Sequence, residues 1–219
     1  MIQKPMFSPQ VEWLPPTEFP NLSEYSEIAI DLETKDPDLK TMGSGSVTGR
    51  GQIVGIAVAV QDWSGYYPIA HEGGGNMDKS MVLKWFQDIL NTDSLKIFHN
   101  AMYDVCYIKA AGLKISGKIV DTMIAGSLVD ENRFRYDLGS MGRDYVGRGK
   151  SEAVLAETAK EWGIDAKSEM YKLPAMYVGE YAEQDAKLTL QLWQEMKKEI
   201  ISQDIEDIFN LETELFPCL

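Results

Sequence analysis

Two carboxylates, Asp31 and Glu33, follow an apolar run in the segment EIAIDLETKD, residues 27–36. In a β-strand, side chains at positions i and i+2 point to the same face of the sheet. Two like charges so close repel each other, and they stabilise nothing unless a positive charge lies between them. Two interpretations are therefore open: a strand that ends in a solvated acidic turn, or half of a metal site that needs further acids.

Two later segments each pair a polar residue with an aspartate four residues further on. FHNAMYD places Asn100 at the end of a strand and Asp104 in the following helix, and YAEQDAKLTLQLW places Tyr181 and Asp185 on a long helix. Positions i and i+4 share one helix face. Asp185 falls beside the apolar stripe of its helix, where a carboxylate is costly unless it is paired or bound to metal. Taken singly, Asp104 could be solvated and Tyr181 could be a core aromatic.

Taken together, the acids predict one site. Four oxygen ligands without histidine or cysteine suit Mg²⁺ or Mn²⁺ rather than zinc. Two such ions about 4 Å apart can activate water against a phosphodiester and stabilise the leaving oxygen. We therefore expect a shared divalent-metal site made by Asp31, Glu33, Asp104 and Asp185.

The composition suits a globular domain. The chain has 219 residues, of which 44% are hydrophobic, and this is enough for one well-packed core. The two cysteines, Cys106 and Cys218, lie far apart, which excludes a disulfide framework and a cysteine zinc site and suits a reducing compartment. No apolar run approaches the roughly 18 residues of a membrane span, and the N-terminus lacks a secretory pattern. We expect a cytoplasmic protein with no membrane partner.

The net charge of −13 lowers the expectation of tight DNA binding, because lysine and arginine drive phosphate binding. A local basic strip, RDYVGRGK from Arg143 to Lys150, departs from this balance. It either binds along the backbone of single-stranded nucleic acid or forms a solvated loop.

Hydrophobic periodicity predicts a sheet followed by helices. Strands are expected at 28–30, 52–60, 65–70, 95–98 and 118–120. Helices are expected at 78–90, 101–111, from 121 onward, and at 136–145, 151–162, 175–198 and 203–215, with a Gly/Ser-rich loop at 42–51. This order is typical of an α/β sheet with an antiparallel edge, flanked by helices.

Three ordered motifs resemble the DEDD superfamily of 3′→5′ exonucleases, in the subclass with tyrosine in the third motif. The motifs are Asp31-Leu32-Glu33-Thr34, Asn100-x3-Asp104 and Tyr181-x3-Asp185. Further segments, among them YYPIAH, DTMIAGSL and LPAMYVGEYAEQDA, are similar to the exonuclease domain of family A (pol I-like) DNA polymerases, particularly bacteriophage ones. The resemblance implies a ribonuclease H-like mixed sheet with antiparallel edge strands, flanked by helices.

The resemblance also implies a domain organisation and a function. Residues 1–24 would be an N-terminal arm, 25–200 the 3′→5′ exonuclease domain, and 201–219 the start of a connection to a polymerase domain outside this sequence. The expected activity is proofreading: hydrolysis of the terminal phosphodiester of a single-stranded or frayed DNA 3′ end. The alternatives are an RNA-trimming exonuclease of the same superfamily and a catalytically silent binding or scaffolding domain.

By resemblance, each site residue has a role around two Mg²⁺ or Mn²⁺ ions. Asp31 would bridge both ions, Glu33 and Asp185 would complete the site of the ion that activates water, and Asp104 would hold the second ion through water. Tyr181 would orient the attacking water, because a tyrosine with a pKa near 10 is a poor base.

The remaining polar and apolar candidates each have two interpretations. Thr34 contacts the 3′-terminal nucleotide or caps a turn, and Asn100 binds a nucleotide or caps a helix. His71 and His99 are expected to be structural, and Asp121 is expected to cap a helix. Four apolar residues either stack against frayed bases or fill gaps in the core: Leu39, Met170, Tyr171 and Leu173.

Overall fold

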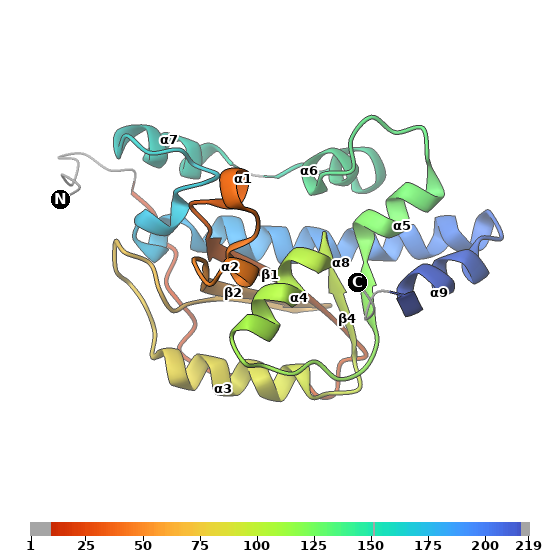
Figure 1. Ribbon diagram of the computed structural model, residues 1–219, viewed down its shortest axis with the longest axis horizontal. Helices are drawn as coiled ribbons and strands as arrows, with labels where there is room; N and C mark the ends of the chain where they lie inside the picture. The colour runs from red at the N-terminus through yellow and green to blue at the C-terminus, as the bar shows by residue number, and fades with distance from the viewer. Residues whose placement is uncertain (1–9, 151, 216–219) are drawn as a thin grey trace.

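The computed structural model describes residues 10–150 and 152–215, and its described strands form one mixed five-stranded sheet (Figure 1). The strands are β1 (Glu27–Lys35), β2 (Gln52–Val60), β3 (Trp63–Pro68), β4 (Leu95–Phe98) and β5 (Ile119–Asp121). Their order is β3-β2-β1-β4-β5; β2 is antiparallel to β1 and β3, and β4 is parallel to β1 and β5. The predicted mixed sheet with an antiparallel edge is confirmed.

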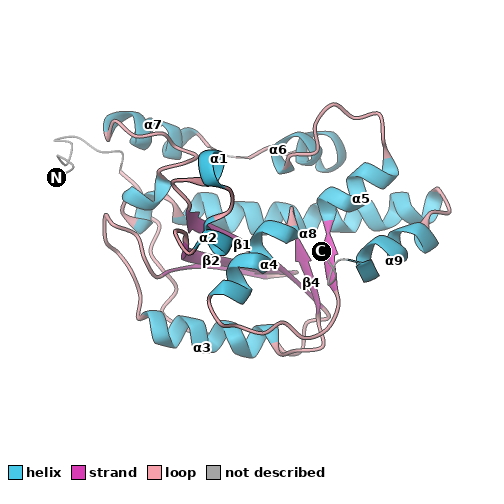
Figure 2. Ribbon diagram, in the orientation of Figure 1, coloured by secondary structure: helices cyan, strands magenta, loops and turns pink. Residues whose placement is uncertain are grey.

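Helices surround the sheet and make up most of the C-terminal half (Figure 2). They are α1 (Leu39–Met42), α2 (Gly45–Thr48), α3 (Lys79–Leu90), α4 (Ala101–Ala110), α5 (Thr122–Val129), α6 (Leu138–Met141), α7 (Ala153–Glu161), α8 (Gly179–Ser202) and α9 (Glu206–Leu215). A π-helix spans Gly142–Val146, and 3-10 turns span Met170–Lys172 and Ala175–Tyr177. The predicted order of elements is confirmed, except that the expected loop at 42–51 contains α2 and follows directly on α1.

Strand β1 is longer than predicted. We expected it to end at Ile30, but it continues to Lys35 because β2 pairs with this part of the strand, with Asp31 opposite Ala57 and Glu33 opposite Gly55. The backbone groups around the two acids are therefore satisfied inside the sheet. The interpretation of a solvated acidic turn is wrong.

The two faces of β1 have different neighbours. Ile28, Ile30 and Leu32 belong to the apolar cluster that contains the buried residues of α3 and α4. Ala29 belongs to the other cluster, which contains the buried residues of α8. Side chains alternate along a strand, so Asp31 and Glu33 share the α8 face with Ala29. Figure 1 shows α8 running along the long axis of the molecule behind this sheet.

Small residues on the α8 face bring the helix close to the strands. Ala29 of β1 and Ala57 and Ala59 of β2 are fully buried in the cluster with α8. Alanine adds little thickness between a sheet and a helix, so polar groups on the two elements can meet across the gap. The N-terminal arm packs here as well, since Trp13 donates a hydrogen bond to Glu183 of α8 at 2.8 Å.

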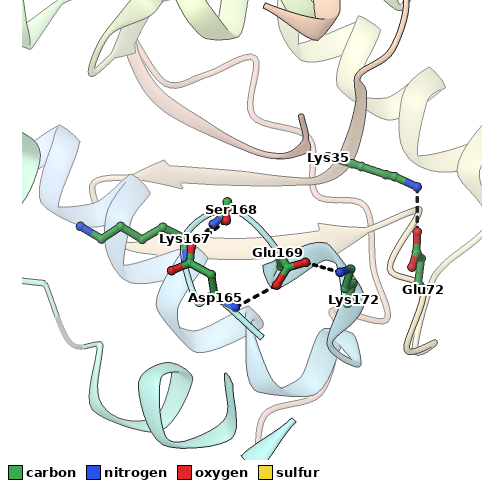
Figure 3. A network of polar contacts seen from close by, with 7 residues as sticks. All are labelled: Lys35, Glu72, Asp165, Lys167, Ser168, Glu169 and Lys172. Atoms are coloured by element: carbon green, nitrogen blue, oxygen red, sulfur yellow. Dashed lines mark hydrogen bonds and ion pairs between the residues drawn. The ribbon is translucent and has the colours of Figure 1, made fainter. Parts of the chain in front are cut away.

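The segment between α7 and α8 is held by polar contacts (Figure 3). Lys35 at the end of β1 forms an ion pair with Glu72 at 2.7 Å, and the backbone N–H of Glu72 donates to the carbonyl of Tyr171 at 2.9 Å. Within the segment, Glu169 forms an ion pair with Lys172 and accepts the backbone N–H of Asp165 at 3.0 Å. These contacts fix the chain that leads into α8.

Three apolar residues of this segment are buried, and one of them, Met170, also lines the cleft beside the acids. Met170, Tyr171 and Leu173 are all buried, whereas Leu39 on α1 is 43% exposed.

Among residues 10–150 and 152–215, no helix is both long and apolar enough to cross a membrane.

Candidate active site

The first pair of acids lies on β1 and faces α8. Glu33 is 8% exposed, and Asp31 is half-buried at the wall of a cleft. Gly55, opposite Glu33 on β2, leaves room for the ring of Tyr66, because a Cβ at residue 55 would lie 2.1 Å from the Tyr66 hydroxyl oxygen. The absence of a side chain at Gly55 therefore lets the Tyr66 ring lie on the strand next to Glu33.

Asp104 lies in the first turn of α4 and is only 5% exposed, so the solvated alternative for this residue is wrong. Its Oδ1 accepts a hydrogen bond from the backbone N–H of Leu32 at 3.2 Å. Leu32 stands between Asp31 and Glu33. The second motif is thus attached directly to the first.

Asp121 holds the start of α4 from the neighbouring strand. Its carboxylate accepts the backbone N–H groups of Asn100 at 2.9 Å and Ala101 at 2.8 Å, and it caps α5 by accepting the N–H of Met123 at 2.8 Å. The expected capping role of Asp121 is confirmed. Because Asp121 satisfies these groups, the side chain of Asn100 makes no capping bond and lines the cleft instead.

Asp185 and Tyr181 approach the strand acids from α8. Asp185 is 2% exposed. Its Oδ2 accepts a hydrogen bond from the ammonium group of Lys150 at 2.5 Å, and the same ammonium donates to the Tyr181 hydroxyl at 3.0 Å. The other oxygen, Oδ1 of Asp185, is buried and has no hydrogen-bond partner among residues 10–150 and 152–215. A buried carboxylate oxygen left without a partner destabilises the fold unless something else binds it.

The acids disfavour one another's charge. Burial, followed by the charge of Asp185, raises the pKa of Asp31 to about 7. Burial and the neighbouring carboxylates also raise the pKa of Glu33 and of Asp104 well above the usual range. Burial raises the pKa of Asp185, although Lys150 opposes this shift. The expected mutual repulsion among the four carboxylates is therefore present.

Tyr181 remains protonated in this environment. Burial raises the pKa of its hydroxyl, and the charges of Asp185, Glu33 and Asp31 raise it further. For Lys150, burial opposes the positive charge, but Asp185, Asp31 and Glu33 outweigh it and raise the pKa of the ammonium. The acids thus hold the ammonium in its charged state, whereas the ammonium only partly opposes the rise in the pKa of the acids.

The donor set fits a hard divalent cation, because it consists of carboxylate oxygens and includes one buried oxygen without a partner. The residues that would hold the ion are Asp31, Glu33, Asp104 and Asp185. As their side chains stand, however, no three acidic, histidine or cysteine groups in residues 10–150 and 152–215 are close enough together to hold an ion. Side chains must therefore move when a cation enters.

A cleft of about 810 Å³ opens beside these acids. Asp31, Asn100 and Tyr181 line it, together with four basic residues: Arg135, Arg143, Lys150 and Lys167. Of the predicted basic strip, Arg143 and Lys150 reach the cleft, whereas Arg148 is exposed and lies outside its lining. Lys167 lies far from every motif in the sequence, and no spacing rule singled it out.

The structure separates Thr34 from the cleft lining. Its hydroxyl shares a hydrogen bond of 2.8 Å with the hydroxyl of Tyr103, which in turn donates to Asp36 at 3.2 Å. A role for Thr34 in nucleotide binding stays a prediction. His71 is buried between the Tyr66 hydroxyl at 2.6 Å and the carbonyl of Leu173 at 3.0 Å, so it is structural as expected.

His99 combines structural contacts with a place at the cleft. Its Nδ1 shares a hydrogen bond of 2.8 Å with the Thr122 hydroxyl, and its Nε2 is buried without a partner. Burial, helped by the charge of Lys150, lowers the pKa of His99 to about 4, so the ring is neutral near pH 7.

Solved structures with a similar fold define the fold class of this chain. NrnC of Brucella melitensis with bound Mg²⁺ superposes with a TM-score of 0.60 and 16% identity, covering 90% of this chain and 84% of that one. RNase D of Escherichia coli gives a TM-score of 0.59 and 16% identity, covering 89% of this chain and 44% of that one. The fold is that of the ribonuclease H-like 3′-5′ exonucleases.

Sequence comparison narrows the class to one family. Residues 19–201 match the family model described as 3′-5′ exonuclease, and the chain belongs to this family. It is 35% identical to the DNA-directed DNA polymerase of Pseudomonas phage M6, covering 100% of this chain and 34% of that protein. DNA polymerase DpoZ of Salmonella phage PMBT28 is 28% identical over 91% of this chain and 31% of its own length. The chain spans about a third of the length of these relatives, and the pol I-like resemblance is confirmed.

Proposed function

We propose that this chain hydrolyses the terminal phosphodiester of a DNA 3′ end with the help of two bound Mg²⁺ or Mn²⁺ ions, and that it proofreads within a larger polymerase. The observation that supports this proposal most strongly is the meeting of three distant motifs at one cleft. Each motif lines the cleft with one residue, namely Asp31, Asn100 and Tyr181, and the remaining acids of the motifs, Glu33, Asp104 and Asp185, are buried.

The carboxylates would hold the cations, which supply an activated water and stabilise the charge on the leaving oxygen. The residues that would hold the ions are Asp31, which faces the cleft from β1, and the buried acids Glu33, Asp104 and Asp185. The hydrogen bond from Leu32 to Asp104 keeps the first and second motifs in register.

Tyr181 would orient the attacking water rather than deprotonate it. Its raised pKa keeps the hydroxyl protonated, and a protonated phenol positions a water molecule by hydrogen bonding. Asn100 lines the cleft with a side chain that makes no capping bond, and it would contact the terminal nucleotide.

The basic residues of the cleft support a nucleic acid substrate despite the net charge of −13. Arg135, Arg143 and Lys167 line the same cleft as the acids, and arginine and lysine bind phosphate oxygens. The similarity to polymerases of phages and bacteria favours DNA over RNA and suggests a polymerase domain as the partner within the same protein.

The test is a degradation assay on 5′-labelled single-stranded DNA and RNA of the same sequence, with Mg²⁺, Mn²⁺ or EDTA. We expect stepwise shortening of DNA from the 3′ end with either metal and none with EDTA. Asp185→Asn should be inactive, whereas Glu183→Gln, a neighbour on α8 that contacts Trp13, should keep its activity. Faster shortening of RNA would favour an RNA-trimming enzyme, and no shortening of either strand would favour a silent binding domain.

A further inference from the structure

The ammonium group of Lys150 lies among the carboxylates rather than in solvent. Its Nζ donates to Oδ2 of Asp185 at 2.5 Å and to the Tyr181 hydroxyl at 3.0 Å, and the Lys150 side chain is only 23% exposed. The ammonium also lies 5.2 Å from the centre of the Tyr181 ring, a distance typical of a cation–π contact. A positive charge thus already occupies the space beside Asp185.

One ammonium group leaves the acidic pocket incompletely neutralised. Lys150 carries a single positive charge, and its ammonium donates to Asp185 and Tyr181. Within the described part of the chain, Oδ1 of Asp185 remains buried without a hydrogen-bond partner beside the ion pair. A divalent cation would bring twice the charge and would bind an oxygen that the ammonium leaves unused.

A divalent cation at Asp185 would lie next to the positive charge of the Lys150 ammonium. Mg²⁺ binds carboxylate oxygens at about 2.0–2.1 Å and requires near-octahedral geometry around itself. The Lys150 Nζ lies within hydrogen-bond distance of the same carboxylate, and two positive charges repel each other strongly in a buried pocket. This repulsion favours movement of the ammonium away from Asp185 as the acids bind an ion.

The surroundings of Lys150 allow this movement. Lysine has a long flexible side chain, and Lys150 already lines the cleft of about 810 Å³ that adjoins the pocket. The ammonium therefore has open space beside it.

We propose that Lys150 is a positioning residue, an internal counter-ion that neutralises the acidic pocket in the absence of metal and competes with the divalent cation for Asp185. When the cation binds, the ammonium moves out of the pocket into the cleft. This inference rests on the proposed metal-dependent function. It gives Lys150, the last residue of the basic strip, a role in metal binding, which a residue that only binds nucleic-acid phosphates would not have.

The first experiment measures Mn²⁺ binding to the chain by calorimetry without nucleic acid. Lys150→Met removes the competitor, and Arg148→Met removes the same charge from an exposed position two residues away. If the ammonium leaves the pocket about 10% of the time, Lys150→Met should lower the apparent Kd about tenfold. Arg148→Met should bind Mn²⁺ like the parent chain.

The outcomes separate this inference from the proposed function. A Kd for Lys150→Met that equals or exceeds that of the parent chain overturns the competition, while binding by the parent chain still supports the metal site. If neither protein binds Mn²⁺, the metal-dependent function and the role of Lys150 both fail.

A second measurement uses the unaltered protein, in case Lys150→Met does not fold. Lysine acetylation by a reactive ester is followed by peptide mass spectrometry, with and without Mn²⁺. Lys150 should react slowly without metal and severalfold faster with it, because the ammonium moves into the cleft. Lys197, paired with Glu27 at 2.7 Å on another part of the surface, should not change. An unchanged rate at Lys150 overturns the proposed displacement.

Discussion

Asp104 accepts the backbone N–H of Leu32, the residue between Asp31 and Glu33, at 3.2 Å. This single contact ties the second motif to the first across 72 residues of sequence. Because the donor is a backbone group in the middle of β1, the position of Asp104 relative to both strand acids depends on the strand itself and not on a flexible side chain. The hydrogen bond and the charge of Asp104 can be separated by substitution.

Asp104→Asn and Asp104→Ala form a matched pair. The asparagine keeps an oxygen that can accept the Leu32 N–H, so the metal-free protein should unfold at a similar urea concentration to the parent chain. The alanine leaves the buried N–H without a partner, which should lower the free energy of unfolding by about 1–3 kcal/mol. Both variants should bind Mn²⁺ more weakly, as measured by calorimetry. Equal stability of the two variants would show that the hydrogen bond contributes nothing.

Tyr181→Phe should leave a slower but active enzyme. Loss of the hydroxyl removes one hydrogen bond that orients water, while the metal ligands remain; we expect a decrease in kcat of about 10²-fold or more. Tyr177→Phe, on the 3-10 turn that precedes α8, is the control and should match the parent chain. Single-turnover rates on a labelled oligonucleotide measure both. A wild-type rate for Tyr181→Phe would reduce this tyrosine to a packing role.

Mn²⁺ affinity should depend on pH near neutrality. Burial and Asp185 raise the pKa of Asp31 to about 7 in the metal-free protein, and a protonated carboxyl does not bind the cation. The apparent affinity should therefore fall as the pH falls below about 7, by about tenfold per pH unit for each proton displaced. Calorimetry between pH 5.5 and pH 8.5, with proton release measured in two buffers, checks this. A constant affinity across that range would contradict it.

His71 should make the fold sensitive to acid. Burial lowers the pKa of this histidine to about 4, and its Nδ1–H donates to the Leu173 carbonyl while Nε2 accepts from Tyr66, which requires the neutral ring. Because the folded pKa is below the unfolded value of about 6.5, the stabilisation is complete above pH 6.5 and is lost as the pH falls toward 4.

The size of this effect is up to about 3 kcal/mol at the acid end. Urea unfolding of the parent chain and of His71→Gln, measured from pH 7.5 to pH 4, isolates the contribution of His71, because other groups titrate equally in both proteins. The difference in unfolding free energy between the two proteins should shrink as the pH falls. A constant difference would mean that His71 titrates alike in the folded and unfolded states.

Paired DNA ends should be degraded more slowly than single strands. The acidic chain has little long-range attraction for DNA, and a paired end must separate before it enters the cleft, at about 1.4 kcal/mol for each base-pair step. We expect single strands to be shortened fastest, mismatched primers next and matched primers slowest. A parallel time course on the three substrates measures this order. Equal rates on all three would contradict the proofreading function.

The local sequence determined most of the helices and strands and identified the four acids of the candidate site. Apolar periodicity predicts β2, α3 and β4 closely, because each is buried along one face or entirely and its pattern is written in neighbouring residues. The spacing Asp31-x-Glu33 places the first motif on one face of β1, and the i,i+4 spacing of Tyr181 and Asp185 places the third on one face of α8, whereas Asn100 lies just before α4. These are short-range relationships, and they follow from the geometry of a strand or a helix.

Relationships between distant segments were decided only by the tertiary structure. β1 extends to Lys35 because β2 supplies hydrogen-bond partners, and Asp104 is buried because α4 starts beside Leu32. Lys150 was predicted either to bind the backbone of single-stranded nucleic acid or to be solvated. Its ammonium instead donates to Asp185, 35 residues further on. No periodicity reports such a contact, since it depends on how the chain after the π-helix folds back over α8, and packing of the whole domain determines that path.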